Sequence, residues 1–420
     1  MGAALPGSGA DGEQWDSLVA VLDLIRRRGV RTRAELGRQL ALGRTLVTQR
    51  VGQLIDSSLV HEGPLGSSIG GRATRELCFR ASAGTVLVAE LGVTKVSVGR
   101  TDLAGTLIEH HEQAWDIAQG PEASLRQIGD LFDAMRPAEP VWGIGLGVPG
   151  PVEFTSGRPI APPMMPGWDG FPVRDWLAAR YAAPVWVDNE VNAMALGEHR
   201  AGLGRGVDDQ VFVKIGSGIG VGLISGGRLH RGAQGCAGDV GHIAVTDPVG
   251  TICRCGKSGC LEAVAGGYAL VRDATAAAEQ GRSEHLAARL LAAGRLEPRD
   301  ITGAAELGDR VALELMNRAG HLIGEMLAML VNFYNPSLMV VGGGVAAVGD
   351  QLLAAIRQNV YLRSLPLATR DLRVVASELE DRAGLVGAGL MVIDELFSRE
   401  RFRSWFDDSS PTGRPELTAS

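Results

Sequence analysis

Three cysteines within eight residues, with a histidine upstream, constrain this chain more than any other feature. Cys253, Cys255 and Cys260 follow His242 in the stretch GCAGDVGHIAVTDPVGTICRCGKSGCLE, residues 235–262, and interspersed glycines let the backbone turn tightly. Three thiolates and one imidazole are donors that Zn²⁺ favours in a tetrahedron, and a closed set of four protein ligands is structural. The spacing therefore predicts one structural zinc ion per chain.

Two other interpretations of these cysteines remain open. A disulfide fits poorly, because five cysteines are few for 420 residues and a Cys-x-Cys pair cannot easily bridge to itself. Unligated surface thiols are the second alternative. Metal-type cysteine usage indicates a reducing compartment, and the chain has neither a signal-peptide core nor an uninterrupted apolar run of about 18 residues. We therefore expect a cytoplasmic protein that does not associate with a membrane.

Charge is distributed unevenly along the chain. Residues 15–80 contain eleven arginines, no lysine and six acidic residues, a net charge of +5, whereas the whole chain carries −7. The length of 420 residues predicts two or three domains. A basic first module on an acidic body is typical of proteins that bind nucleic acid at one end.

The basic segment has the pattern of a winged helix-turn-helix. Apolar stripes at 18–25 and 47–55 predict two helices, and between them a Thr32–Glu35 capping box opens a short third one. From Leu59 to Arg80 the pattern predicts strand, glycine-rich turn and strand, as in a wing. The alternative is a helical interaction domain whose arginines form a solvated face. On the DNA-binding interpretation, the contacting side chains are Arg44, Thr45, Thr48, Gln49, Arg50, Gln53, Arg72 and Arg75.

The rest of the chain falls into two halves that each begin with strands and a glycine turn suited to phosphate. Residues 85–112 predict two strands. We expect a duplicated α/β architecture with ligands in the cleft between two lobes. The glycine turns hold Gly92, Thr94, Gly216, Ser217, Gly218, Gly342, Gly343 and Gly344. The predicted division is a disordered lead-in at 1–14, the DNA-binding domain at 15–80, a first lobe at 81–190 plus about 380–398, a second lobe at 191–379, and a flexible tail at 399–420.

A series of motifs in these halves resembles the ROK family of repressors, open reading frames and kinases. The motifs are Glu90-Leu-Gly-Val-Thr-Lys95, Asp188-Asn-Glu-Val-Asn192, Gly216-Ser-Gly-Ile-Gly220, Asp239-Val-Gly-His242, Cys253-x-Cys255-Gly-x-x-Gly-Cys260-Leu-Glu262 and Gly342-Gly-Gly344. The resemblance extends from Leu59 to about Phe397 and implies a two-lobed, actin-like sugar kinase fold of the ribonuclease H-like type. Together with the winged helix it implies the repressor branch, similar to xylose and N-acetylglucosamine repressors, which are typically homo-oligomeric.

The resemblance also implies a sugar site. It assigns sugar hydroxyl contacts to Asn189, Glu190, Asp239, His242 and Glu262. His242 would hold zinc with one ring nitrogen and touch sugar with the other. Carboxylates and an amide suit vicinal hydroxyls in a buried cleft, because such groups are costly when left unpaired.

The same resemblance argues against efficient catalysis. Family kinases carry an Asp as general base where this chain has Glu190, and an Asp and a second glycine in the first phosphate turn where it has Glu90 and Val93. A misplacement on the order of 1 Å can cost ~10²-fold in rate. A branched side chain also stands where phosphate approaches the backbone most easily at glycine. Phosphoryl transfer is therefore expected to be weak or absent.

We expect a transcriptional regulator, a repressor of carbohydrate-utilisation genes, whose affinity for a palindromic double-stranded operator responds to a sugar or sugar phosphate in the cleft. A homodimer or homotetramer is expected. The first alternative is an active ATP- and Mg²⁺-dependent sugar kinase with a regulatory DNA-binding arm, in which Glu190 is the base. The second is a regulator controlled by a protein partner, with a vestigial sugar cleft.

Overall fold

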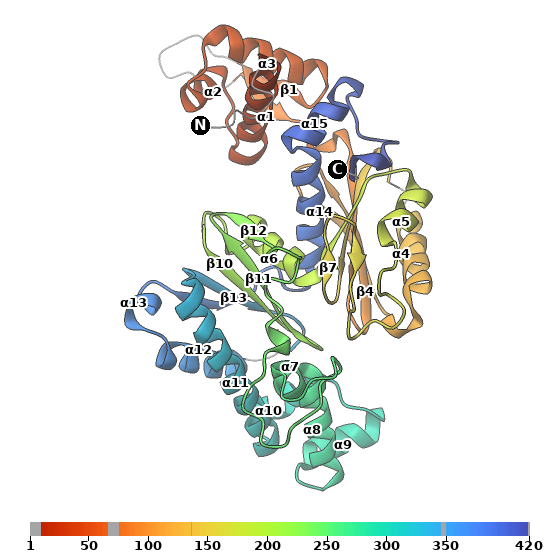
Figure 1. Ribbon diagram of the computed structural model, residues 1–420, viewed down its shortest axis with the longest axis vertical. Helices are drawn as coiled ribbons and strands as arrows, with labels where there is room; N and C mark the ends of the chain where they lie inside the picture. Colours follow the sequence, from red (N-terminus) through yellow and green to blue (C-terminus); the bar gives the residue numbers. More distant parts are fainter. Residues whose placement is uncertain (1–9, 66–74, 136, 346–349, 419–420) are drawn as a thin grey trace, which may run out of the picture.

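The computed structural model describes residues 10–65, 75–135, 137–345 and 350–418, which form an N-terminal helical domain and two α/β lobes (Figure 1). In Figure 1 the N-terminal domain lies at the top, the first lobe at the right and the second lobe below. Within the described ranges, no helix is both long enough and apolar enough to cross a membrane.

The N-terminal domain consists of three helices and a two-stranded antiparallel sheet: α1 (Ala10–Arg28), α2 (Arg33–Leu40), α3 (Arg44–Asp56), β1 (Val60–Leu65) and β2 (Arg75–Phe79). Thr32 caps α2 as predicted, since its Oγ1 accepts the Glu35 N–H. The Glu35 carboxylate accepts the Thr32 hydroxyl, not the Thr32 backbone N–H that would complete the capping box. The turn between β1 and β2 lies outside the described residues. α1 begins at Ala10, so the predicted disordered lead-in is wrong for residues 10–14, and residues 1–9 lie outside the described residues.

A five-stranded sheet forms the centre of the first lobe, in the spatial order β5-β4-β3-β6-β9. β4 is antiparallel to β3 and β5, whereas β3, β6 and β9 are parallel. The prediction of two strands over residues 85–112 is wrong, because β5 is a third strand whose largely exposed side chains give no apolar alternation. The lobe's elements are β3 (Thr85–Leu91), β4 (Lys95–Asp102), β5 (Leu107–Ala114), α4 (Pro121–Met135), β6 (Val141–Val148), β7 (Val152–Glu153), β8 (Arg158–Pro159), α5 (Val173–Tyr181) and β9 (Val185–Asn189).

The second lobe repeats this sheet topology, in the order β12-β11-β10-β13-β14. Its first three strands form an antiparallel meander, and β13 and β14 extend it in parallel from β10. The predicted duplication is therefore confirmed. The strands are β10 (Gln210–Ile215), β11 (Ile219–Ser225), β12 (Arg228–His230), β13 (Leu338–Gly342) and β14 (Arg373–Ala376). The helices are α7 (Leu261–Ala265), α8 (Gly267–Glu279), α9 (Glu284–Ala293), α10 (Pro298–Glu306), α11 (Arg310–Tyr334), α12 (Asp350–Arg363) and α13 (Pro366–Thr369).

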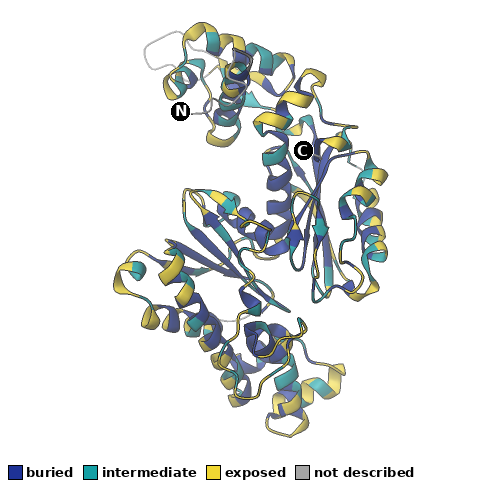
Figure 2. Ribbon diagram, viewed as in Figure 1, coloured by how far each residue is buried: buried dark blue, intermediate teal, exposed yellow. Residues whose placement is uncertain are grey.

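Two buried helices, α6 (Glu190–Ala201) and α14 (Ala383–Leu396), pack against each other and join the lobes (Figure 2). α14 packs on β3 and β6 of the first sheet, while α6 packs on β10 and β11 of the second. Glycine permits this close approach: a Cβ placed on Gly387 would lie 1.7 Å from the Ala193 carbonyl oxygen. A displacement of α6 would therefore move α14 and change the packing on both sheets.

The C-terminal segment is folded over residues 399–418, so the prediction of a flexible tail is wrong there, and residues 419–420 lie outside the described residues. α15 (Arg399–Trp405) contacts α1, and Trp15 meets Phe406 edge-on with ring centroids 5.7 Å apart. On the other side Trp405 packs against Trp142 of the first sheet at 5.2 Å. Charged residues interleaved with these aromatic rings made the segment look polar in sequence. The segment joins the N-terminal domain to the first lobe.

Candidate functional site

The four predicted metal ligands meet in one group, here called the metal cluster. Their donor atoms all lie within 4.8 Å of one another. Cys253 Sγ is 3.6 Å from His242 Nδ1, and Cys255 Sγ is 3.6 Å from Cys260 Sγ. Zinc–sulfur bonds of about 2.3 Å place tetrahedral sulfurs roughly 3.8 Å apart, so the group fits Zn²⁺ in size and donor type. Burial raises the pKa of the Cys260 thiol to about 12, so a bound cation is needed to keep it a thiolate.

Local backbone geometry holds the metal cluster together. His242 ends a short 3₁₀ turn, and Cys260 is the N-cap residue of α7. An antiparallel bridge joins Ala244 to Cys260, and the loop folds back through left-handed glycines at 256 and 259, with φ of +86° and +72°. Cys236 is exposed and does not belong to the group. Short-range turns thus suffice to gather all four ligands.

Three predicted sugar contacts border the metal cluster. His242 Nε2 faces Asp239 Oδ1 at 4.0 Å, while Nδ1 of the same ring faces the sulfur of Cys253. That the first nitrogen contacts sugar while the second binds metal stays a prediction. Glu262 Oε2 accepts the Ile219 N–H at 3.1 Å, and burial raises the pKa of its carboxyl group. The carboxylate of Glu262 is therefore held at the start of β11, while that of Asp239 lies beside His242.

The other two predicted sugar contacts, Asn189 and Glu190, lie at the N-terminus of α6. Asn189 caps the helix, because its Oδ1 accepts the N–H groups of Val191 and Asn192. Its Nδ2 donates to Glu190 Oε2 at 2.9 Å. Val191 lies against Gly220, so this helix end also borders the start of β11. The polar elbow predicted between strand and helix is present.

Glu90, Glu190 and Lys214 form a second group, here called the charge cluster. Lys214 Nζ lies 2.9 Å from Glu190 Oε1, and their side chains are only 17% and 8% exposed. Glu90 is buried, and its Oε2 has no hydrogen-bond partner among the described residues. Burial raises the pKa of Glu90 to about 7, against the opposing attraction of Lys214. Burial would lower the pKa of Lys214, but the attraction of Glu190 and Glu90 prevails and raises it.

Lys214 was missed by the sequence analysis. The available signal was a charged residue inside the otherwise apolar strand QVFVKI, immediately before a glycine turn. A lysine in such a strand is rarely buried without a partner. Because the partners come from residues 90 and 190, the pairing itself was not readable from the strand.

The predicted phosphate turns lie at strand ends and are closed by their own backbone bonds. The Gly92 N–H donates to the Lys95 carbonyl, and the Gly216 N–H donates to the Gly218 carbonyl. Gly343 has φ of +95°, and a Cβ there would lie 2.7 Å from the Ile215 carbonyl oxygen. Thr94 lies in the first turn, Ser217 in the second, and Gly342 and Gly344 flank Gly343. Val93 packs against the first-lobe core. Whether any turn receives a phosphate stays a prediction.

Most predicted DNA contacts lie at the surface of α3 or β2. The prediction that Arg50 faces outward is wrong, since its side chain is buried. Arg50 lies on the same helix face as Val47, so its Nε reaches Ser17 Oγ of α1 at 2.8 Å and its Nη1 bonds Gln53. Gln53 is half-buried, and Arg72 lies outside the described residues. The exposed members of the set are Arg44, Thr45, Thr48, Gln49 and Arg75.

Comparison with known proteins decides the family. The model of the ROK family matches residues 86–395. The chain belongs to the ROK family. The two-lobed α/β ROK fold predicted from the motifs is thereby confirmed for the body of the chain.

Among relatives of this ROK protein, the xylose repressor of Caldicellulosiruptor bescii is 30% identical over 386 residues, covering 90% of this chain and 95% of that one. The glucokinase of Halalkalibacterium halodurans is 32% identical over 317 residues, but covers 74% of this chain and 96% of its own length. A solved ROK family transcriptional regulator, homologous to the E. coli MLC protein, has a TM-score of 0.79 and 26% identity, covering 94% of this chain and all of that one. The regulators thus match more of the chain than the kinase does.

Proposed function

We propose that this ROK protein is a sugar-responsive transcriptional repressor that binds operator DNA through its N-terminal domain. The observation that carries the proposal is the exposed row of Arg44, Thr45, Thr48 and Gln49 on α3, in a domain that accompanies a ROK body. Charged and amide side chains on one helix face suit phosphates and base edges. Similarity to a xylose repressor over 90% of the chain supports the same function.

The effector site of this proposal is the cleft bordered by both groups of predicted sugar contacts. Asn189 and Glu190 provide an amide and a carboxylate from α6, and Asp239, His242 and Glu262 provide their groups beside the metal cluster. One zinc ion bound by that cluster would be structural, fixing the loop that carries three of the contacts. Removal of zinc would then abolish sugar binding.

In this proposal α6 couples the effector cleft to the N-terminal DNA-binding domain. Glu190 begins the helix, and at its far end Arg200 Nη1 lies 2.9 Å from Asp394 Oδ2 of α14. The other oxygen of Asp394 lies 2.9 Å from Arg27 Nη2 of α1. One carboxylate therefore contacts both the effector-binding helix and the N-terminal domain. A sugar that favours one position of α6 would change the position of α3 through these contacts.

The charge cluster weighs against the kinase alternative. A general base must be free to accept the proton of the substrate hydroxyl. Here the carboxylate at the base position, Glu190, is held by Lys214 at 2.9 Å. We expect no phosphorylation of hexoses above background with ATP and Mg²⁺. Robust phosphorylation of glucose would favour the kinase over the repressor. If a protein partner controls the regulator, that partner should be captured whether or not sugar is present. Sugar should then leave operator binding unchanged.

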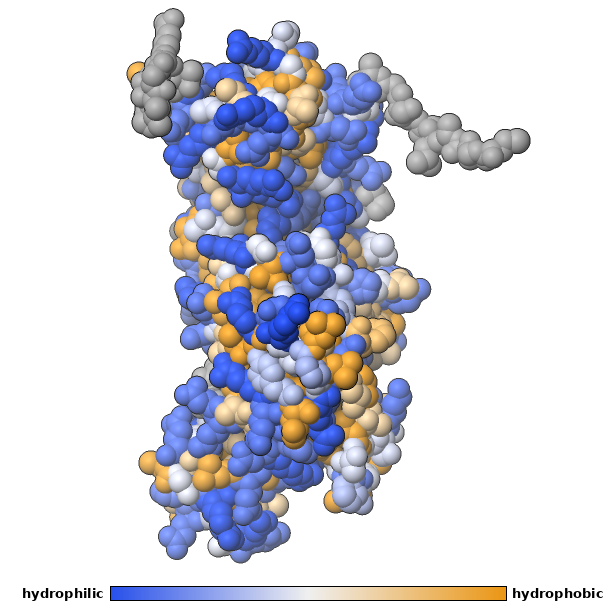
Figure 3. Space-filling view, turned by 90° about the vertical axis from the view of Figure 1, so that its left-hand side faces the viewer, coloured by the Kyte–Doolittle hydropathy of each residue, from blue (hydrophilic) through white to orange (hydrophobic). Residues whose placement is uncertain are grey.

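A homodimer would place two N-terminal domains on the half-sites of a palindrome. Large apolar side chains on or beside α11, α12 and α13 are exposed: Met329, Phe333, Leu362, Leu365 and Leu367. These helices lie on the left of Figure 1, the side that faces the viewer in Figure 3, where apolar surface is drawn in orange. Exposed patches of this kind mark interaction surfaces. In the proposal a second copy covers this one, and Phe333→Glu with Leu362→Glu would yield monomers in light scattering.

The decisive experiment is a gel-shift titration. Operator DNA selected from random duplexes would be titrated with wild-type protein, then with xylose, glucose and their phosphates. Gln49→Ala should weaken operator binding about tenfold or more, since one bidentate base contact is worth about 1–3 kcal/mol. Arg28→Ala changes an exposed arginine outside α3 and is the matched control. A selected operator whose affinity no sugar alters would remove the sensing function.

A further inference from the structure

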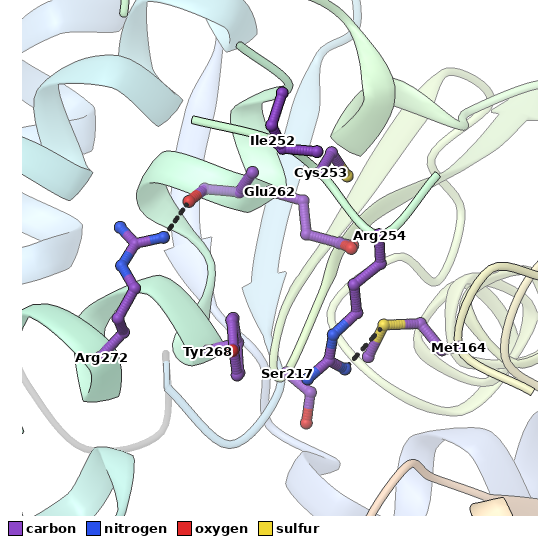
Figure 4. A pocket seen from close by; sticks show the side chains of 9 residues that line it. Met164, Ser217, Ile252, Cys253, Arg254, Glu262, Tyr268 and Arg272 are labelled. Atoms are coloured by element: carbon purple, nitrogen blue, oxygen red, sulfur yellow. Dashed lines mark hydrogen bonds between the residues drawn. The ribbon is translucent and has the colours of Figure 1, made fainter. Parts of the chain in front are cut away.

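A pocket lies beside the metal cluster and is bordered by two arginines (Figure 4). Met164 enters it from the first lobe and Ser217 from the turn between β10 and β11. Arg254 comes from the loop that carries the metal cluster, and Tyr268 and Arg272 come from α8. The pocket thus spans the two lobes. Glu262, a predicted sugar contact, lines it as well.

Arg254 has only weak partners in this pocket. Its Nη1 lies 3.1 Å from Met164 Sδ, and its guanidinium carbon lies 4.2 Å from the centroid of the half-exposed Tyr268 ring. A thioether is a weak acceptor, and no ion pair joins Arg254 to a carboxylate in the described part of the chain. Arg272, in contrast, donates to Asp273 at 2.7 Å and to a backbone carbonyl at 3.1 Å. Arg254 is exposed and attracts the nearby Glu262 carboxylate without a direct hydrogen bond to it, so its guanidinium keeps N–H donors for a ligand.

The position of Arg254 is fixed from both ends. Its neighbours in sequence, Cys253 and Cys255, are both members of the metal cluster, so the backbone at this residue cannot move freely. At the other end the guanidinium is stacked on Tyr268. An arginine presents a planar fork of N–H donors that matches phosphate and carboxylate oxygens. Because the fork is already oriented, binding an anion costs little ordering.

We propose that this pocket binds the anionic group of a charged sugar, a phosphate or a carboxylate, and that Arg254 selects such effectors over neutral sugars. The inference rests on the proposed function, because Glu262 places the pocket next to the predicted hydroxyl contacts. The Ser217 hydroxyl supplies a further donor on the same wall. An anion bound here would contact Arg254 in place of the Met164 thioether, which comes from the opposite lobe. Charge recognition and lobe position would then be linked.

The test is calorimetric titration of zinc-loaded, full-length protein with glucose, glucose 1-phosphate, glucose 6-phosphate, glucuronate and inorganic phosphate. At least one charged sugar should bind the wild type more tightly than glucose, and this advantage should shrink as salt is added. Arg254→Gln should weaken that charged ligand about 10- to 100-fold, the range expected for a charge-assisted contact, and leave glucose within about threefold. The phosphate and glucuronate arms distinguish the two sources of negative charge.

Matched variants keep the test sharp. Lys257→Gln removes a positive charge from the same loop, outside the pocket lining, and should leave both ligand classes unchanged. Tyr268→Leu retains the charge but removes the ring beneath it, and should produce a smaller selective loss. Zinc content and thermal unfolding confirm that each variant is folded.

Three outcomes would overturn the inference. If glucose binds and releases operator DNA while no charged sugar binds more tightly, the inference fails and the proposed function stands. If Arg254→Gln weakens neutral and charged sugars equally, the residue is structural and selects nothing. If no sugar of either kind binds, the inference and the proposed function fail together.

Discussion

The metal cluster and the charge cluster are assembled from different ranges of the chain. All members of the metal cluster lie between His242 and Cys260, in one loop closed by its own turns. The charge cluster takes Glu90 from β3, Glu190 from α6 and Lys214 from β10. The first group therefore needs only a local fold and a metal ion, whereas the second requires both sheets in place. Variants of the first group therefore test the loop, and variants of the second test the packing between the two sheets.

The largest effect is expected for Cys255→Ser. A serine hydroxyl does not replace a thiolate on zinc, and structural zinc sites contribute on the order of 10 kcal/mol to the order of their loops. The variant should lose stoichiometric zinc in elemental analysis and unfold at a lower temperature. Cys236→Ser is the control, because Cys236 is exposed and outside the cluster. Retention of one tightly bound zinc ion by Cys255→Ser would contradict the assignment.

Lys214→Met should be next in magnitude. The change leaves Glu190 buried without its cation, which typically costs about 3–5 kcal/mol. Urea unfolding at pH 7 measures the loss. The double variant Lys214→Met with Glu190→Gln should recover most of it, since no uncompensated charge remains. Lys257→Met provides an exposed lysine for comparison. A Lys214→Met protein as stable as wild type would show that the ion pair with Glu190 does not stabilise the fold.

Glu90 makes the charge cluster sensitive to pH. Its pKa is raised to about 7 by burial, whereas an unfolded glutamate titrates near 4.3. The folded chain therefore keeps a proton that the unfolded chain has lost, and stability falls as pH rises from about 4.5 through 7. The loss is on the order of 3 kcal/mol. Glu90→Gln should lack this slope in urea unfolding between pH 5 and 8, while the exposed-site variant Glu122→Gln keeps it. Parallel profiles for Glu90→Gln and wild type would refute the buried-proton account.

Asp394→Asn should have the smallest effect on stability. Its ion pairs with Arg27 and Arg200 are partly exposed, with side chains 21–37% accessible, so each contributes about 0.2–1 kcal/mol. The buried Arg26 also lies 3.9 Å from Asp394, but it retains a closer carboxylate in Asp23 at 3.0 Å. The expected loss is in coupling: sugar should shift the gel-shift midpoint less than in wild type, although sugar affinity is retained. Asp23→Asn is the control, because the partners of Asp23 among the described residues, Arg26 and Arg27, belong to α1 as it does. A full sugar response in Asp394→Asn would exclude this route.

The C-terminal segment and Arg50 show where prediction from sequence fails. Residues 399–418 contain no regular apolar stripe, and the burial of their aromatic rings depends on Trp15 and Trp142, which lie far away in the chain. The residue type of Arg50 predicts a DNA contact, yet its side chain is buried and donates to Ser17 of another helix. In both instances the deciding partner lies outside any local window. The third strand, β5, was missed because an exposed edge strand carries little hydrophobic signal.

The sequence by itself determined the metal cluster and the capped helix α2, because each depends on spacing within one short segment. It also predicted the duplicated architecture, but not the order of the strands, which pair across long stretches of chain. Only the tertiary structure decided that Lys214 neutralises the carboxylate of Glu190 and that Asp394 contacts both α1 and α6. Charges of opposite sign are plentiful in any sequence. Which of them meet in a buried site is settled by the packing of the two sheets and the helix pair between them, since burial is what makes such a meeting strong.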